Sequence, residues 1–198
     1  MKDKGNLIQF LLYKDIMNWY KKILTSDYKD DNINSMNKEF IIMRGCPSSG
    51  KSFLANQLAG EAGGIFSADD YHTDPQTQEY NWKPENVRAA HQWNHDRIKK
   101  AIEQGISPVI IDNTHIKKWE LMALKPLVNL AQQNEYNVRI EEPNPEWHHW
   151  DTAFDEEALY ERSKKTHKLP REAIQKMINN YEHNVSIDDI LNCQLPSP

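Results

Sequence analysis

From residue 39 onward, segments in which apolar residues follow one another alternate with segments in which they recur every three or four positions. Short apolar runs lie at residues 40–43, 64–66 and 108–111, and runs of this kind are typical of buried strands. Residues 138–140, Val-Arg-Ile, also predict a strand. Between these runs the apolar residues recur at helical spacing, which predicts helices over 51–61, 84–104, 117–133, 155–163 and 171–183. Strands that alternate with helices form right-handed crossovers, so the pattern predicts an α/β fold with a parallel sheet and helices on both faces.

A different pattern precedes this region. Residues 6–24 carry apolar side chains at helical spacing, which predicts an amphipathic N-terminal helix suited to docking a protein partner. Residues 26–38 are polar and rich in Asn and Asp, as in a linker. We therefore expect a helix with a linker over 1–37, a folded domain over 38–185 and a frayed C-terminal tail over 186–198.

Composition narrows the class of protein. The chain has 198 residues, of which 38% are hydrophobic, and this is enough apolar material for one folded domain. The net charge of −5 argues against coating nucleic acid by overall charge, although a local basic patch is compatible with it. The apolar runs are far shorter than the roughly 20 residues of a membrane-spanning helix, so we expect no membrane association.

Cysteine usage indicates the compartment. Only Cys46 and Cys193 occur, so neither a disulfide framework nor a zinc site of the CxxC type can form. The apolar run at 7–12 ends in the polar residues 13–15 with no small-residue cleavage site, unlike a secretory signal. We expect a reducing compartment, cytoplasmic or nuclear.

The strongest motif is a phosphate-binding loop. Residues 45–52 complete the pattern G-x-x-x-x-G-K-S between a predicted strand and a predicted helix, namely Gly45, Cys46, Pro47, Ser48, Ser49, Gly50, Lys51 and Ser52. In such a loop the backbone N–H groups bind the β-phosphate of ATP, the lysine neutralises the β- and γ-phosphates, and the hydroxyl ligates Mg²⁺. The alternative is a coincidental glycine-rich turn before a helix. For Cys46, a role as a small loop filler is favoured over redox control.

Acidic residues follow two of the predicted strands. Asp69 and Asp70 come after the strand at 64–66 and should lie at the same sheet edge as the phosphate-binding loop. We assign Asp69 as the base that accepts the proton of an attacking hydroxyl, and Asp70 to helix capping or to contacts with Mg²⁺-bound water. Asp112 ends the strand at 108–111 and is the candidate Mg²⁺ partner of Ser52. The alternatives are N-cap acids for the first pair and a turn residue for Asp112.

Two further segments suggest contacts with substrates. Residues 162–171 hold five Lys or Arg in ten positions, which fits a lid whose cations close on phosphates; a solvated surface turn is the alternative. Aromatic residues that follow Asp69 could stack an acceptor base or simply pack the helix at 84–104, and they are Tyr71, Tyr80, Trp82 and Trp93.

Taken together, these segments resemble the polynucleotide-kinase-like P-loop family, and within it the kinase-like domains of Nedd-four-binding-protein-2-like proteins. The resemblance spans about residues 39–185 and rests on R-G-C-P-S-S-G-K-S at 44–52, F-S-A-D-D-Y at 66–71, G-I-S-P-V-I-I-D-N-T at 105–114 and L-P-R-E-A-I-Q-K-M at 169–177. It implies a P-loop NTPase fold and an ATP-dependent 5′-hydroxyl polynucleotide kinase, with Asp69 as base. It also implies that Arg162 binds nucleotide and that Lys164 stands where bacteriophage kinases of this type carry a lid arginine.

The sequence departs from the family pattern at several positions. Ser48 replaces a loop glycine, His72 replaces an arginine that contacts the acceptor phosphate, and His115 replaces an asparagine. The lid carries Lys164 and Lys165 in place of an arginine–asparagine pair, and a lysine lacks the bidentate fork of arginine. Two alternative functions follow: an ATP-binding adaptor or regulatory module with weakened catalysis, and a small-molecule kinase on the same fold.

Overall fold

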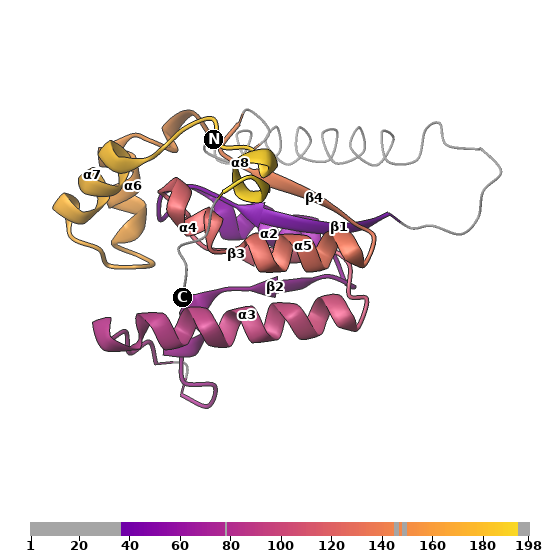
Figure 1. The fold of residues 1–198 in the computed structure, drawn as a ribbon. Helices are drawn as coiled ribbons and strands as arrows, with labels where there is room; N and C mark the ends of the chain where they lie inside the picture. Colours follow the sequence, from indigo (N-terminus) through magenta and orange to yellow (C-terminus); the bar gives the residue numbers. More distant parts are fainter. Residues whose placement is uncertain (1–36, 78, 145–146, 148–149, 194–198) are drawn as a thin grey trace, which may run out of the picture. The chain divides into compact units, whose positions relative to one another are not determined.

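The computed structural model describes residues 37–77, 79–144, 147 and 150–193. The sheet has four strands in the order β2-β3-β1-β4, all parallel (Figure 1). The strands are β1 (Lys38–Met43), β2 (Gly64–Phe66), β3 (Val109–Asp112) and β4 (Tyr136–Glu141). The predicted parallel α/β fold is thus confirmed. The predicted N-terminal helix at 6–24 lies outside the described residues, as does the predicted linker up to residue 36, and Lys38 at the end of that linker belongs to β1.

Helices cover both faces of the sheet. On one face, α2 (Lys51–Ala59) packs Ala55 and Ala59 against Ile41, Met43 and Ile110. The opposite face carries the larger core, where Phe40, Ile42, Val109 and Ile111 meet α3 (Val87–Glu103), α5 (Lys125–Gln133) and α8 (Ile187–Leu191). Because successive side chains of a strand point to opposite faces, the continuous apolar runs supply both cores at once.

One predicted helix is divided in the structure. The segment 117–133 forms α4 (Lys118–Met122) and α5, which begins immediately after Leu124. Pro126 stands in the first turn of α5, where its missing N–H costs no hydrogen bond but where it would interrupt a continuous helix. Short 3-10 helices also occur, namely η1 (Ala68–His72), η2 (Pro84–Asn86) and η3 (Trp150–Thr152).

The expected tail boundary at residue 186 is wrong. Helix α8 lies beyond it, and Ile190 is fully buried in the larger core. Ser186 begins this helix with a capping box: its hydroxyl accepts from the N–H of Asp189 at 3.2 Å, and its own N–H donates to Asp189 Oδ2 at 2.9 Å. The S-x-x-D signal was present in the sequence, but a five-residue helix is too short to show an apolar period.

A third, smaller core lies at the carboxyl end of the sheet. Helices α6 (Glu156–Ser163) and α7 (Arg171–Asn180) pack there around Cys46, Ile116, Leu159, Ile174 and Tyr181. Arg44 is fully buried beside this core, and its guanidinium donates to the carbonyls of His115 and Glu182 at 3.0 and 2.8 Å. These contacts tie the loop after β3 and the segment after α7 to the end of β1. Within the part of the chain described here, no helix is both long and apolar enough to cross a membrane.

Candidate functional site

The phosphate-binding loop connects β1 to α2, as predicted. Gly50 immediately precedes the helix with φ of 102°, a left-handed conformation that favours glycine. At Gly45 a Cβ atom would lie 2.8 Å from Ser49 Oγ, so that position has no room for a side chain. The first turn of a helix that begins in this way carries N–H groups at its N-terminal end, which is the arrangement that binds phosphate.

Lys51 is held at the centre of this loop. Its side chain is only 7% exposed, and Nζ donates a hydrogen bond to the Cys46 carbonyl at 2.9 Å. Burial lowers the pKa of Lys51, while the nearby negative charges of Asp112 and Asp69 oppose that shift. The lysine therefore carries a poorly compensated positive charge, which a bound phosphate would stabilise.

Ser48, which stands where the family pattern has a glycine, has a left-handed backbone conformation. Its φ is 63°, so the loop accepts a left-handed serine at a cost of order 1 kcal/mol or more. Two contacts from the lid support this conformation: Arg162 Nε donates to the Ser48 carbonyl at 2.9 Å, and the hydroxyls of Ser48 and Thr166 lie 3.3 Å apart.

Cys46 is a packing residue in this structure. Its side chain is fully buried in the third core, and burial raises the pKa of the thiol to about 11. A thiol with such a pKa is protonated at neutral pH and a poor nucleophile, so the geometry favours the loop-filler interpretation over redox control.

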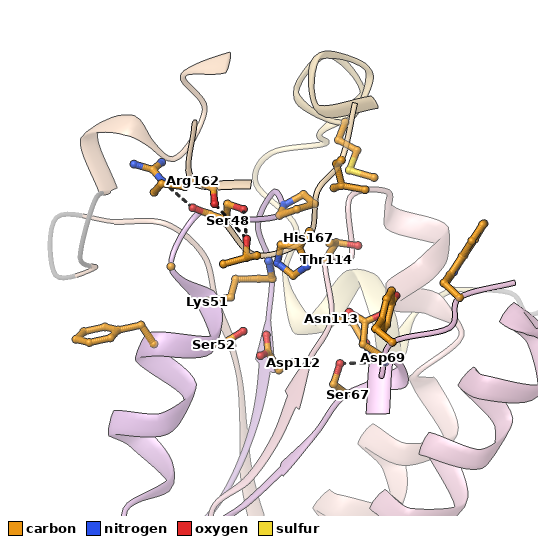
Figure 2. Close-up of a pocket in the computed structure, with 18 of the residues that line it drawn as sticks. Ser48, Lys51, Ser52, Ser67, Asp69, Asp112, Asn113, Thr114, Arg162 and His167 are labelled. Carbon is orange, nitrogen blue, oxygen red and sulfur yellow. Dashed lines mark hydrogen bonds between the residues drawn. The ribbon is translucent and has the colours of Figure 1, made fainter. Parts of the chain in front are cut away.

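A cavity of about 1010 Å³ opens above the phosphate-binding loop (Figure 2). The loop contributes Pro47, Ser48, Gly50, Lys51 and Ser52, whereas Gly45, Cys46 and Ser49 lie behind this surface. The ends of β2 and β3 and the lid supply further walls, which include Ser67, Asp69, Asp112, Asn113, Thr114, Arg162, Lys165, Thr166 and His167. Apolar and aromatic residues complete the lining: Phe53, Tyr80, Trp82, Val87, Leu169 and Met177.

Asp69 faces the phosphate-binding loop across this cavity (Figure 2). It lies in η1, where the Ser67 hydroxyl accepts from the Asp69 N–H at 3.2 Å and Asn113 Oδ1 accepts from the Ala68 N–H at 3.1 Å. Asn113 follows β3, so this hydrogen bond fastens η1 to the neighbouring strand end. Tyr80 Oη donates to Asp69 Oδ1 at 3.1 Å, and burial together with Asp69 raises the Tyr80 pKa to about 12, so the tyrosine remains a donor at neutral pH.

Asp70, by contrast, does not line the cavity. Its Oδ2 accepts from Arg97 Nη1 at 2.9 Å on the outer side of η1. Helix capping is performed by Ser67 rather than by either aspartate. The two neighbouring acids are therefore separated in space, and the predicted contact of Asp70 with Mg²⁺-bound water has no geometric support.

The residues predicted to hold Mg²⁺ lie together. Ser52 and Asp112 both line the cavity beside Lys51, and Asp112 Oδ1 is buried without a hydrogen-bond partner among the described residues (Figure 2). An unsatisfied carboxylate oxygen beside a hydroxyl at a phosphate-binding loop fits Mg²⁺, which binds proteins through few oxygen ligands and keeps several waters. Within the described ranges, no cluster of three or more His, Cys, Asp or Glu forms an all-protein metal cage.

The lid contributes different cations from those expected. Lys164 points away from the cavity, where its ammonium pairs with Glu161 and lies 4.7 Å from the centre of the Tyr160 ring. Lys165 lines the cavity instead. Lys164 is the C-cap residue of α6 and still has helical backbone angles. Its side chain therefore follows the helical direction and meets Glu161 three positions earlier.

Arg162 lines the cavity, but its guanidinium is engaged by protein groups. Besides Nε to the Ser48 carbonyl, Nη1 donates to Thr152 Oγ1 and Nη2 to the Thr152 carbonyl, both at 3.0 Å. These bonds position the lid against the phosphate-binding loop. They use three of the five guanidinium N–H donors, so the predicted direct contact with nucleotide would have to be made by the other two.

Two of the family departures are buried. His72 and His115 are 7% and 5% exposed, and neither lines the cavity. His115 Nδ1 lies 2.9 Å from the Met43 carbonyl, and burial lowers its pKa to about 4, so it is neutral at physiological pH. Neither histidine is therefore placed to contact an acceptor bound in the cavity.

Sequence reasoning missed His167. Its imidazole enters the cavity from the lid, above Lys51 and Thr114 (Figure 2). Partial burial and the charge of Lys51 lower the pKa of His167, whereas the carboxylates of Asp69 and Asp112 raise it. The basic run drew attention to the lysines, and a histidine among them carries no distinct sequence signal.

The charges around His167 give a test of the cavity's geometry that needs no substrate. In an NMR titration, the pKa of His167 should lie below its ordinary value near 6.5. Asp69→Asn should lower it further, because the carboxylate favours the imidazolium, and Lys51→Met should raise it, because the ammonium opposes a second positive charge.

His95 is the matched control for this titration. Its pKa is lowered by burial and by His91, so neither substitution should move it. A His167 pKa that is the same in both variants as in the wild type would show that the lid does not face these groups.

Comparison with known proteins agrees with this geometry. The profile of a family described as AAA domain matches residues 40–183. Human NEDD4-binding protein 2 is 37% identical over 158 residues, which are 79% of this chain but only 8% of that protein. The structure of the Pnkp1/Rnl/Hen1 RNA repair complex contains a similar fold, with a TM-score of 0.52 and 18% identity over 77% of this chain and 46% of that chain.

These findings confirm the resemblance drawn from the motifs. Because its identity to this chain is low, the solved structure supports the fold alone. The family match extends over β1, the phosphate-binding loop, the acidic strand ends and the lid. The chain therefore belongs to the AAA domain family, as a P-loop nucleotide-binding domain of the kinase-like type.

Proposed function

We propose that this domain transfers the terminal phosphoryl group of ATP to a hydroxyl acceptor, and that the acceptor is the 5′-OH end of a nucleic acid. One observation carries the proposal: Lys51 and Asp69 line the same cavity from the ends of two different strands. A cavity of about 1010 Å³ has room for a nucleotide and for an acceptor between these residues.

The residues that line the cavity account for each part of the phosphoryl transfer. The acceptor oxygen attacks the γ-phosphorus in line, the bond from that phosphorus to the oxygen bridging it to ADP breaks, and the acceptor proton passes to Asp69. Tyr80 holds Oδ1 of Asp69 at 3.1 Å, so we assign Oδ2 to the proton. Lys51 stabilises the negative charge that spreads over the phosphoryl oxygens.

Mg²⁺, when bound, would neutralise the β- and γ-phosphates and orient them for displacement. Ser52 and Asp112 are the residues of this chain that would hold it. The lid, through Lys165 and His167, would exclude water, so that the γ-phosphoryl group of ATP passes to the acceptor rather than to water.

The acceptor side favours a nucleoside over a smaller alcohol. Tyr80 and Trp82 line the cavity next to Asp69, and they are 55% and 50% exposed. Exposed aromatic rings stack nucleobases of any sequence. They therefore suit a terminal nucleoside whose 5′-OH points at Asp69.

The experiment is a transfer assay with ATP labelled in the γ-phosphate and Mg²⁺, on an acceptor panel of 5′-OH DNA, 5′-OH RNA and nucleosides. We expect label on 5′-OH ends, none on 5′-phosphorylated oligonucleotides, and loss of transfer when EDTA removes Mg²⁺. Binding of ATP without transfer to any acceptor would contradict the proposal and favour the nucleotide-binding adaptor. Transfer to nucleosides alone would restrict it to a small-molecule kinase.

A further inference from the structure

Four aromatic rings form a continuous row that leads out of the cavity. The ring centres of Trp93 and Tyr71 are 5.6 Å apart, those of Tyr71 and His72 are 5.6 Å apart, and those of His72 and Tyr80 are 6.1 Å apart. Tyr80, at the inner end, donates to Asp69. The row therefore begins at the proposed base and ends on the surface of α3.

The outer end of the row lies in a depression separate from the cavity. This depression of about 480 Å³ is lined by Asp70, Tyr71, Thr73, Pro75, Trp93 and Arg97. Tyr71 and Trp93 keep 40% and 36% of their surface exposed there. Exposed aromatic side chains that are not needed for the core and that gather in a hollow are typical of a binding surface.

The two charged side chains of the depression, Arg97 and Asp70, are paired with each other. Arg97 lies 4.2 Å from the centre of the Trp93 ring and 2.9 Å from Asp70 Oδ2. The guanidinium thus fixes the indole, and its charge is compensated by Asp70. A ligand here would gain contact with ring faces, whereas the depression offers little net charge to attract a phosphate.

We propose that the exposed rings of this row, Trp93, Tyr71 and Tyr80, line the path of a single-stranded acceptor, with the nucleotides that follow the 5′ end stacked on Tyr71 and Trp93, while the buried His72 packs between Tyr71 and Tyr80. The inference rests on the proposed function for the position of the 5′ end. It adds that a polynucleotide is preferred to a nucleoside, and that unpaired bases are required because only they expose a face for stacking.

Direct binding tests the path independently of transfer. A 5′-OH oligothymidylate labelled with fluorescein at its 3′ end would be titrated with protein and followed by fluorescence anisotropy. Trp93→Ala should raise the Kd roughly tenfold, the scale expected for one stacked base. Trp93→Phe should retain most of the affinity, since it keeps an aromatic face, and a fully paired duplex should bind more weakly than the single strand.

The control is Trp119→Ala, because Trp119 is 67% exposed on α4 and lines neither hollow. Its Kd should equal that of the wild type. The slope of log Kd against log salt should be the same for Trp93→Ala and the wild type, because the ring contributes stacking rather than charge.

Several results would overturn the path: a wild-type protein that does not bind the oligonucleotide, a Trp93→Ala variant with unchanged Kd, or equal affinity for duplex and single strand. Failure of the proposed function is distinguishable from these. A protein that binds single strands through Trp93 but transfers no phosphoryl group would support the acceptor path and contradict the proposed kinase activity. Transfer to nucleosides without oligonucleotide binding would support the kinase activity and contradict the path.

Discussion

Asp69→Asn should lower kcat for phosphoryl transfer by about 10²- to 10⁴-fold, the contribution expected of a positioned general base. The amide is almost isosteric with the carboxylate, so Tyr80 can still donate to its oxygen and the fold of η1 should persist. Binding of ATP should be retained, because the nucleotide is held by the phosphate-binding loop on the other side of the cavity. Single-turnover kinetics gives the rate, and calorimetry gives the Kd for ATP.

The neighbouring aspartate is a stringent comparison for this variant. Asp70 pairs with Arg97 outside the cavity, so Asp70→Asn should keep the wild-type kcat. Any effect of this substitution should fall on the KM for an oligonucleotide acceptor. Equal losses of kcat in the two variants would remove the distinction between them. Full kcat in Asp69→Asn would assign the base to another residue.

The sequence predicted those parts of the site that depend on local rules. The phosphate-binding loop is a contiguous motif, so its strand, turn and helix are specified together. Asp69 and Asp112 follow strands, and the carboxyl ends of parallel strands meet at one edge of the sheet. Both acids are therefore expected at the cavity that Lys51 lines, without knowledge of the strand order.

The directions of lid side chains depend on features that the sequence does not display. Whether Lys164 or Lys165 enters the cavity depends on the residue at which α6 ends, and helix ends are the least predictable part of a sequence. Arg162 bonds to Ser48 and Thr152, and the first of these lies 114 positions away in the chain. A contact of that kind follows only from tertiary packing, so a motif that locates the arginine cannot show what its guanidinium binds.

Lys51→Met should remove activity without destabilising the protein that is free of ATP. We expect kcat/KM to fall by roughly 10²- to 10³-fold, because a preorganised charge opposite the transferred phosphoryl group is lost. Burial lowers the pKa of Lys51, so its protonation costs free energy of folding. That cost is complete below the folded-state pKa and is relieved as pH rises toward the ordinary value of 10.5. Methionine has similar length and no charge, so the free energy of unfolding should equal or exceed that of the wild type.

The same variant separates folding from ligand binding in one measurement. At an ATP concentration 100 times the Kd, the wild type should gain about 2.7 kcal/mol of stability, whereas Lys51→Met should gain almost none at that concentration. Lys99→Met is the control, since the Lys99 side chain is 59% exposed and its Nζ lies 3.8 Å from Glu103 Oε1, so its loss should leave the gain from ATP intact. Chemical denaturation with and without ATP gives both quantities. A less stable Lys51→Met protein that still gains the full 2.7 kcal/mol from ATP would contradict the role of Lys51, because it would make the lysine a structural residue and place the phosphates elsewhere.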